Sequence, residues 1–526
     1  MAAPSRSWRA ARLSPATAWT GIAQRDDAPS GRGGQLCTNS AAIACVHTAR
    51  RIEMAEPGLS RPVDPLVFGD QPQEMMWLNR TASLEIAPAE AEAIQLAAVR
   101  KRFADLRDRL PVLANLAREQ GIEEIRDLDD AAALLFKHSV YKSYPVSLIE
   151  KNRFDRLTAW LANLTIADLS GVKTDGVETI DDWLDALQRD AGVRITHSTG
   201  TSGKLSFLPR GPLDAGLQLR TGRLCQENLF QPEPTGLETV PTVVVGHREM
   251  YNGYGANVES MVNDLYNGDE AMVVVMDPGR LSADVLSLGG RLATAESRGE
   301  IGRSQISPAI LNRLEEFRAA QKDAPARRAR FFDTIFETLL GKRVMMAANW
   351  AMYNEMLEAG RERGATRIFA PDSLILSAGG TKGKILPGGF KEDIREFLGV
   401  DAISEGYGMS EISGLMAKCS AGKYHAPPWM LVFLLDPETG APSERSGTHT
   451  GRFGVIDLAI QERWGGILSG DEVTMTFGEC ACGLSGPHID DSIRRYSDAE
   501  GGDDKITCAG APEAHDNALS FLAEMD

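Results

Sequence analysis

The sequence lacks the features that mark several large classes of protein. It contains no apolar run of about 18 residues, which argues against a membrane span and for a soluble protein. It has 56 Lys and Arg against 73 Asp and Glu, and the net charge of −17 argues against charge-driven binding to nucleic acid or to an anionic membrane. Repeats, coiled-coil heptads and low-complexity recognition segments are also missing, so a scaffold protein finds no support.

Cysteine is scarce as well, because the 526 residues contain only seven. An odd, scattered set is not a disulfide framework, so we expect a reducing, cytoplasmic location. Cys480 and Cys482 lie in Glu-Cys-Ala-Cys-Gly and, with His488, offer half of a metal site, but one intervening residue is short for zinc. We therefore interpret them as structural cysteines at a turn. The seven cysteines are Cys37, Cys45, Cys225, Cys419, Cys480, Cys482 and Cys508.

Composition sets the start of the chain apart from the rest. Residues 1–53 hold seven Arg, no Lys and no apolar periodicity, so we expect a disordered extension outside the core. This segment resembles an Arg-rich transit segment, and an equally simple hypothesis is that translation begins at Met54. We expect the main part of the chain, with a helical front, to begin at residue 54.

The pattern of apolar residues predicts an α/β fold of packed sheets and helices. Helical spacing comes first, with Trp160 expected in the core, and β-prone runs then alternate with helices. The predicted helices cover residues 87–118, 122–136, 148–164, 333–340, 347–358 and 390–398, and the predicted strands cover residues 242–245, 272–275 and 373–377.

A loop rich in hydroxyl groups and glycine, residues 197–206, follows a short β-prone segment at residues 193–195. Hydroxyl donors and glycine backbone suit the wrapping of phosphate groups, although plain turn chemistry is the alternative. The loop is not a Walker A motif, because Ser198 replaces its first Gly and Leu205 follows Gly203-Lys204. The donors and glycines are Ser198, Thr199, Gly200, Thr201, Ser202, Gly203 and Ser206.

Two further glycine-bearing blocks follow short apolar runs. Ala378-Gly379-Gly380 comes directly after the predicted strand and before a helix, which is the kind of turn that binds ligands at the carboxyl edge of an open sheet; a tight turn without a ligand is the alternative. Ser404-Glu405-Gly406-Tyr407-Gly408-Met409-Ser410-Glu411 repeats this pattern.

These blocks, in this order, resemble the acyl-adenylate-forming superfamily, and within it the acyl-protein synthetase branch of bacterial luciferase operons, with phenylacetate-CoA ligases as more distant relatives. The similarity covers residues 140 to 510, and five motifs in order are more specific than any one. The motifs are the phosphate loop at 198–206, the Gly-Gly adenine segment at 377–383, Tyr407-Gly408-Met409-Ser410-Glu411, Ser469-Gly470-Asp471, and Cys480-Ala481-Cys482-Gly483 followed by Arg495 and Asp504-Lys505-Ile506.

The resemblance implies a large adenylate-forming domain with a helical front over residues 54–478, which binds ATP and Mg²⁺. It also implies a truncated C-terminal appendage, a short subdomain and hinge over residues 479–526. The implied contacts are β- and γ-phosphate with Ser198, Thr199, Thr201 and Ser202, with Gly200 and Gly203 allowing the wrap; adenine with Gly379, Gly380 and Tyr407; α-phosphate with Ser410; Mg²⁺ with Glu411; ribose with Asp471; and ribose or phosphate with Arg495.

For the second substrate, the resemblance implies a fatty or other apolar acid bound near His247, Gly253 and Gly255. For His247, a structural hydrogen-bond donor is the alternative. The acyl group is expected to pass to a thiol, with Cys508 as a candidate acceptor and an inert cysteine as the alternative.

The chain departs from the superfamily in two places. Ser206 stands where the phosphate loop usually ends in lysine, and only 21 residues follow Lys505, so we expect this chain to lack the domain that carries the catalytic lysine in the superfamily. Lys505 is the candidate substitute cation, or a solvated hinge residue. We predict an ATP-dependent acyl-adenylate-forming ligase that transfers its acyl group to a protein cysteine, with an acyl-CoA ligase, an amide-forming ligase or a nucleotide-binding protein without catalysis as alternatives.

Overall fold

The computed structural model of the chain describes residues 65–78, 86–200, 204–217, 220, 235–297, 314–381, 384–496 and 506–507. Contacts along the chain divide it into Met1–Leu59 and Ser60–Asp526, and every described residue belongs to the second unit. The extension expected at residues 1–53 lies outside the described residues. Within the ranges above, no helix combines the length and apolar character needed to cross a membrane.

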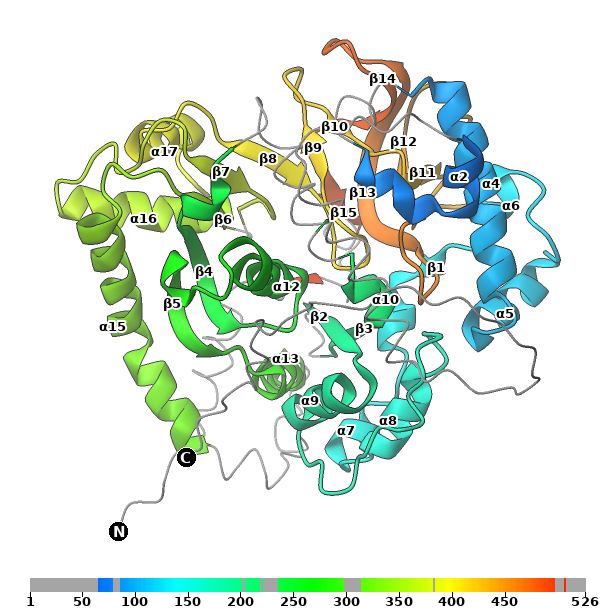
Figure 1. The fold of residues 1–526 in the computed structure, drawn as a ribbon, viewed down its shortest axis with the longest axis horizontal. Helices are drawn as coiled ribbons and strands as arrows, with labels where there is room; N and C mark the ends of the chain where they lie inside the picture. The colour runs from blue at the N-terminus through cyan, green and yellow to red at the C-terminus, as the bar shows by residue number, and fades with distance from the viewer. Residues whose placement is uncertain are drawn as a thin grey trace, which may run out of the picture. The chain divides into compact units, whose positions relative to one another are not determined.

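One large mixed sheet organises the described part of the chain (Figure 1). Its first half is parallel, and at β8 the pairing changes to antiparallel, because β8 pairs parallel with β7 and antiparallel with β9. The sheet and its helices confirm the predicted α/β class. In sheet order, the strands are β5 (Val273–Arg280), β4 (Thr242–Glu249), β6 (Met345–Ala348), β7 (Leu374–Ser377), β8 (Ser404–Tyr407), β9 (Met416–Lys418), β10 (Tyr424–His425), β14 (Ser485–Ile489), β13 (Gly466–Glu479), β12 (Gly447–Asp457) and β11 (Met430–Leu435), with β1 (Phe136–Lys137) and β15 (Arg494–Arg495) beside β13.

A second, three-stranded sheet carries the predicted phosphate loop. β2 (Arg194–Gly200) and β3 (Ser206–Arg210) form an antiparallel hairpin around that loop. β16 (Ile506–Thr507) pairs with the end of β2, through Gly200 and Thr199. A segment from the end of the sequence therefore adds a strand to the loop hairpin.

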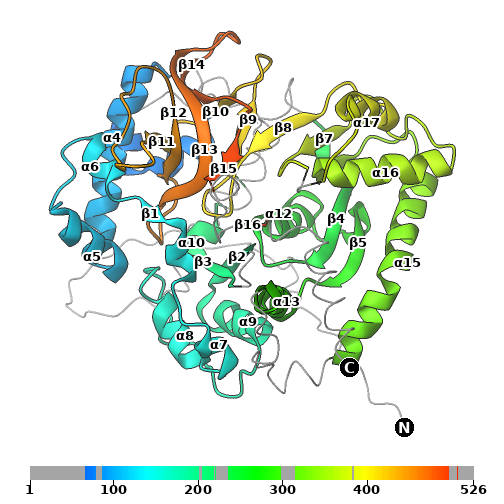
Figure 2. The same ribbon diagram turned by 180° about the vertical axis from the view of Figure 1, so that it is seen from behind.

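Helices flank the two halves of the large sheet, as Figures 1 and 2 show from opposite sides. α4 and α5 share one apolar core with strands β11 to β13, whereas α15, α16 and α17 share another with the parallel strands. The helices are α2 (Pro65–Asp70), α4 (Pro88–Leu106), α5 (Pro111–Gln120), α6 (Leu128–Ala132), α7 (Ser147–Glu150), α8 (Phe154–Leu161), α9 (Ile180–Ala191), α10 (Pro212–Ala215), α12 (Gly253–Ser260), α13 (Ala283–Ser297), α15 (Leu314–Thr338), α16 (Trp350–Glu362) and α17 (Phe390–Leu398).

The helical pattern predicted α17 well and α15 poorly. α17 begins at Phe390 and ends before Gly399, whose φ of 79° suits glycine, and it buries Ile394 and Phe397 as expected. α15 begins at Leu314, well before the predicted residue 333, and continues through Pro325. Trp160 is only partly buried and packs against two core clusters.

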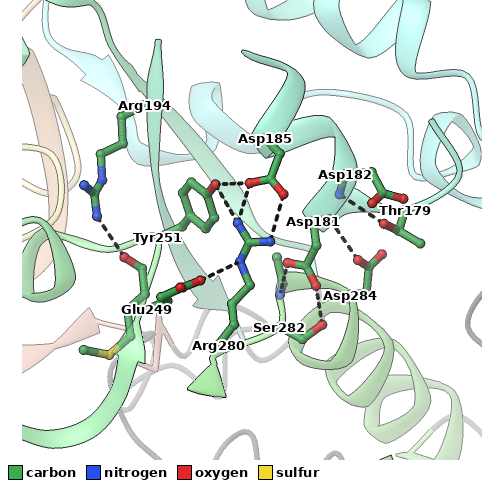
Figure 3. A network of polar contacts seen from close by, with 12 residues as sticks. Thr179, Asp181, Asp182, Asp185, Arg194, Glu249, Tyr251, Arg280, Ser282 and Asp284 are labelled. Carbon is green, nitrogen blue, oxygen red and sulfur yellow. Dashed lines mark hydrogen bonds and ion pairs between the residues drawn. The ribbon is translucent and has the colours of Figure 1, made fainter. Parts of the chain in front are cut away.

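A polar network joins the starts of α9 and α13 (Figure 3). Asp284, in the first turn of α13, accepts hydrogen bonds from the backbone N–H groups of Ile180 and Asp181, at 2.8 and 2.9 Å. Asp181, in the first turn of α9, accepts in return from the N–H of Ala283 and the hydroxyl of Ser282. Each helix thus satisfies free N–H groups of the other, which fixes the two helices beside the loop hairpin.

Candidate functional site

One part of the candidate site lies at the carboxyl end of β8, where the large sheet changes from parallel to antiparallel. The Tyr407 hydroxyl donates to Asp471 Oδ2 at 2.7 Å, and Arg495 Nε lies 2.9 Å from Asp471 Oδ1. Asp471 is 4 % exposed. The burial of the Tyr407 hydroxyl, and then the charge of Asp471, raise the pKa of Tyr407 far above its usual range. The structure therefore brings three predicted site residues together from β8, β13 and β15.

The segment after β8, which carries Ser410 and Glu411, is held by its backbone carbonyl groups. Arg210 of β3 donates to the carbonyl oxygens of Ser410 and Ile412, at 3.1 and 3.3 Å. Arg463 donates to the carbonyl oxygen of Glu411 at 2.5 Å. Three consecutive carbonyl groups are thus fixed by two buried guanidinium groups, which are charged donors and bind more strongly than neutral ones.

The far end of this segment is fixed by a buried carboxylate. Asp457 Oδ2 accepts from the N–H of Ser413 at 2.5 Å, and burial raises the pKa of Asp457 to about 6. Burial also lowers the pKa of Arg210 to about 10. The segment is therefore shaped by charges that are themselves costly to bury, and this is the kind of cost that functional sites tolerate.

Glu411 is only 8 % exposed, and burial raises the pKa of its carboxyl group. The charges of Arg463, His138 and Arg495 act in the opposite direction and favour the carboxylate. A buried carboxylate oxygen is the kind of ligand that a hard cation prefers, so Glu411 fits the predicted Mg²⁺ contact.

The loop hairpin is tied to this segment and to the substrate region. Through Arg210, β3 reaches the carbonyl groups described above, while the N–H of His197 in β2 donates to the carbonyl oxygen of Tyr251 at 2.8 Å. Ser198 lies in β2 rather than in the loop, and its buried hydroxyl forms a 2.6 Å hydrogen bond with Ser206.

The other predicted loop residues are only partly described. Thr199 and Gly200 are placed by their strand pairing with Thr507 and Ile506. Thr201, Ser202 and Gly203, as well as Lys505 and Cys508, lie outside the described residues.

Gly379 and Gly380 lie at the same edge of the sheet as Tyr407. The register aligns Leu376 of β7 with Ser404 of β8, so Gly379 and Tyr407 each stand three residues beyond an aligned pair. Gly379 and Gly380 have φ of 84° and 64°, a backbone conformation that L side chains rarely adopt. The turn that the sequence predicted here is present.

The predicted substrate residues lie at the end of β4 and the start of α12. His247 is buried, with Nε2 3.6 Å from Asp277 Oδ2, and burial lowers its pKa. Gly255 packs so closely that an added Cβ would stand 2.3 Å from the carbonyl oxygen of Met250, whereas Gly253 has open space around it. Close packing explains the glycine at 255, and the open space leaves 253 free to face a ligand.

Sequence reasoning missed the residues that hold the 410–412 segment: Arg210, Arg463 and Asp457. A signal for Arg210 was present, because it ends an otherwise uncharged five-residue strand. Arg463 and Asp457 had no such signal, since their partners are 52 and 44 residues away in sequence.

Comparisons with known proteins found structures that resemble this one. 2-Hydroxyisobutyryl-CoA ligase, in complex with 2-HIB-AMP and CoA in the thioesterification state, is 14% identical with a TM-score of 0.46, covering 84% of this chain and 75% of its own. Apo MatB from Rhodopseudomonas palustris is 12% identical with a TM-score of 0.31, covering 66% and 61%. The luciferase-like enzyme of the nonluminescent mealworm Zophobas morio is 12% identical with a TM-score of 0.31, covering 57% and 56%. No protein-family model and no curated protein sequence matches the chain.

Proposed function

We propose that this protein activates a carboxylic acid with ATP to form an acyl-adenylate, and then transfers the acyl group to a thiol. The observation that carries the proposal is the convergence of Tyr407, Asp471 and Arg495 beside a segment fixed by buried arginines. This cluster stands at the carboxyl edge of the parallel strands, where open sheets bind ligands.

In the first step, a carboxylate oxygen of the acid attacks the α-phosphorus of ATP. A new O–P bond forms, the bond from the α-phosphorus to the bridging oxygen breaks, and pyrophosphate leaves. Two anions must approach each other, so stabilising negative charge is the main requirement. Arg495 is a described cation beside Asp471, and bound Mg²⁺, held by Glu411, would neutralise phosphate charge.

The nucleotide contacts follow from the chemistry of each side chain. Asp471 can accept from the two ribose hydroxyl groups, because a carboxylate offers about four acceptor positions and its described partners take two. The glycines at 379 and 380 and the ring of Tyr407 form two sides of an adenine site, and Ser410 would donate to the α-phosphate. Ser198, Thr199, Thr201 and Ser202, with Gly200 and Gly203, would surround the β- and γ-phosphates.

In the second step, a thiolate attacks the acyl carbon, the C–S bond forms and AMP leaves. We propose a protein cysteine as acceptor, with Cys508 as candidate and Lys505 as the candidate substitute cation. β16 consists of the two residues between Lys505 and Cys508 in the sequence. It pairs with Thr199 and Gly200 of the loop strand, and this pairing supports the assignment. The second candidate for the product is an acyl-CoA or an amide. In either case we propose that a fatty or other apolar acid binds near His247, Gly253 and Gly255. We also propose that the enzyme is cytoplasmic.

Acid-dependent exchange of labelled pyrophosphate into ATP tests the first step, whatever the acceptor. We expect exchange with at least one acid from a panel of fatty and aromatic acids. Glu411→Gln should reduce the rate roughly a hundredfold, because it removes the carboxylate that binds the cation. Glu472→Gln is the matched control, since Glu472 pairs with Arg494 outside the cluster and its variant should keep the wild-type rate.

Two outcomes would contradict the proposal. ATP binding without exchange for any acid would indicate a nucleotide-binding protein without catalysis. Equal exchange rates in the Glu411 and Glu472 variants would remove the proposed role of Glu411. For the second step, acyl label that is released by hydroxylamine should be lost in Cys508→Ala, and unchanged labelling would exclude this acceptor.

A further inference from the structure

Three cysteines and one histidine from distant parts of the sequence meet outside the cluster of Tyr407, Asp471 and Arg495. One ligand atom from each of Cys419, His425, Cys480 and Cys482 lies within 4.8 Å of the other three. Cys480 and His425 are buried, and the other two are partly buried. From the sequence we interpret Cys480 and Cys482 as structural cysteines at a turn, with His488 as the nearby histidine. In the structure, His425 is the histidine beside the sulfurs, and Cys419 supplies the third sulfur.

The distances suit one tetrahedral zinc ion. Zn–S and Zn–N bonds of about 2.3 and 2.05 Å at tetrahedral angles put two sulfurs roughly 3.8 Å apart and sulfur and nitrogen roughly 3.6 Å apart. Cys419 Sγ and Cys480 Sγ are 3.9 Å apart, and Cys482 Sγ and His425 Nε2 are 3.4 Å apart. A disulfide does not explain the cluster, since bonded sulfurs stand about 2.05 Å apart.

The two turns that carry the cysteines have the same backbone design. Cys419 N–H donates to the carbonyl of Lys423, and Gly422 N–H donates back to the carbonyl of Cys419, at 2.8 and 2.9 Å. In the second turn, Cys480 N–H donates to the carbonyl of Leu484 at 2.8 Å, and Gly483 N–H donates to the carbonyl of Cys480 at 2.9 Å. Gly422 and Gly483 both have positive φ, 75° and 90°. Two matching turns that present sulfur to each other are a built site rather than a chance cluster.

We propose that Cys419, His425, Cys480 and Cys482 bind a structural Zn²⁺ ion. Thiolate and imidazole ligands select zinc over Mg²⁺ or Ca²⁺, which prefer oxygen. Four protein ligands leave no open position for substrate or water, so the ion has a structural role. This proposal does not depend on the proposed adenylation activity.

The ion would join two hairpins of the large sheet. Cys419 follows β9 and His425 ends β10, whereas Cys480 and Cys482 lie between β13 and β14. β9 pairs with β8, which carries Tyr407, and β13 carries Asp471. The zinc ion therefore fastens together the two parts of the sheet that supply the partners of the Tyr407 to Asp471 hydrogen bond.

Metal content of the full chain tests the proposal. The chain is expressed with zinc in the medium, purified without chelator or a metal-binding tag, and analysed by elemental mass spectrometry. We expect one zinc ion per chain, and a tenfold or larger loss of zinc in Cys480→Ser and Cys482→Ser. His488→Asn is the matched control, because the His488 ring stacks on His425 at 5.3 Å but lies outside the ligand set, and this variant should keep its zinc.

A second measurement applies where a cysteine variant fails to fold. Cobalt substituted into the wild-type chain should give the absorption spectrum of a tetrahedral thiolate complex. Four results would each overturn the proposal. The folded wild-type protein could contain no zinc, or it could contain iron instead. The wild type and Cys480→Ser could contain equal zinc, or the mass could be lower by two hydrogens because of a Cys419–Cys480 disulfide.

Discussion

At the scale of single residues, the hydrogen bond between Tyr407 and Asp471 determines how the candidate ribose contact is oriented. The Tyr407 ring also packs edge to face against Phe453, with ring centroids 5.5 Å apart. The ring and the hydroxyl therefore have separable roles, since one fills space and the other holds a carboxylate.

Tyr407→Phe removes the hydroxyl and keeps the ring. Hydrogen bonds to charged groups contribute about 1.5–3 kcal/mol, so we expect the KM for ATP in pyrophosphate exchange to rise roughly tenfold or more. Tyr424→Phe is the matched control, because its ring lies 6.1 Å from that of Tyr407 and its side chain is not part of the Asp471 contact. An equal KM in the two variants would contradict the orienting role.

At the scale of secondary-structure elements, the exchange of caps between α9 and α13 places two carboxyl groups close together in the interior. Burial, and then the charge of Asp181, raises the pKa of Asp284 to about 7 from an unfolded value of 3.8. The protonated form is thus favoured in the folded protein. Its contribution to stability is complete below about pH 4 and is lost as the pH rises through 7.

Asp284→Asn should remove this part of the pH dependence, because an amide does not titrate in this range. We expect the free energy of unfolding of the wild type to fall, relative to that of the variant, between pH 4 and pH 7. Urea unfolding of both proteins across this range measures the difference. Two parallel curves would show that Asp284 titrates as it does in the unfolded chain.

At the scale of the whole molecule, one core joins the front of the chain to its second half. All six residues of β11 are buried although it ends the sheet. α4 is joined to the residues just before β11, because Gln95 Nε2 donates to the carbonyl of Pro428 at 2.9 Å. Leu431 and Ile94 belong to the same cluster. The N-terminal helices are therefore part of the main core rather than an appended layer.

Leu431→Ala should lower the free energy of unfolding by about 2–5 kcal/mol, because it leaves a cavity in this core. Leu340→Ala makes the same chemical change at a residue that is 56% exposed, and should cost less than about 0.5 kcal/mol. Chemical denaturation of both variants measures the two costs. Similar values would mean that β11 and α4 do not pack as described.

The sequence predicted those features of the molecule that depend on local pattern. The α/β class, α17 and the glycine turn after β7 follow from periodicity and from the residues that a positive φ requires. The proposed zinc site could not be predicted in full. Cys419 lies beside Cys480, which is 61 residues away in sequence, and this contact depends on the antiparallel pairing of β10 with β14. The same limit applies to Arg463, whose role exists only once Glu411 has been placed beside it by the fold.

The arginines that hold the segment at 410–412 have a consequence for anyone who wishes to reuse this site. Arg210 arrives from the small sheet and Arg463 from the approach to β13, so the shape of the segment is encoded in two remote places. A protein engineer who grafted residues 404–418 alone onto a foreign scaffold would transfer the motif without the two arginines that hold its backbone in shape. A successful transplant would have to carry both guanidinium donors along with the peptide.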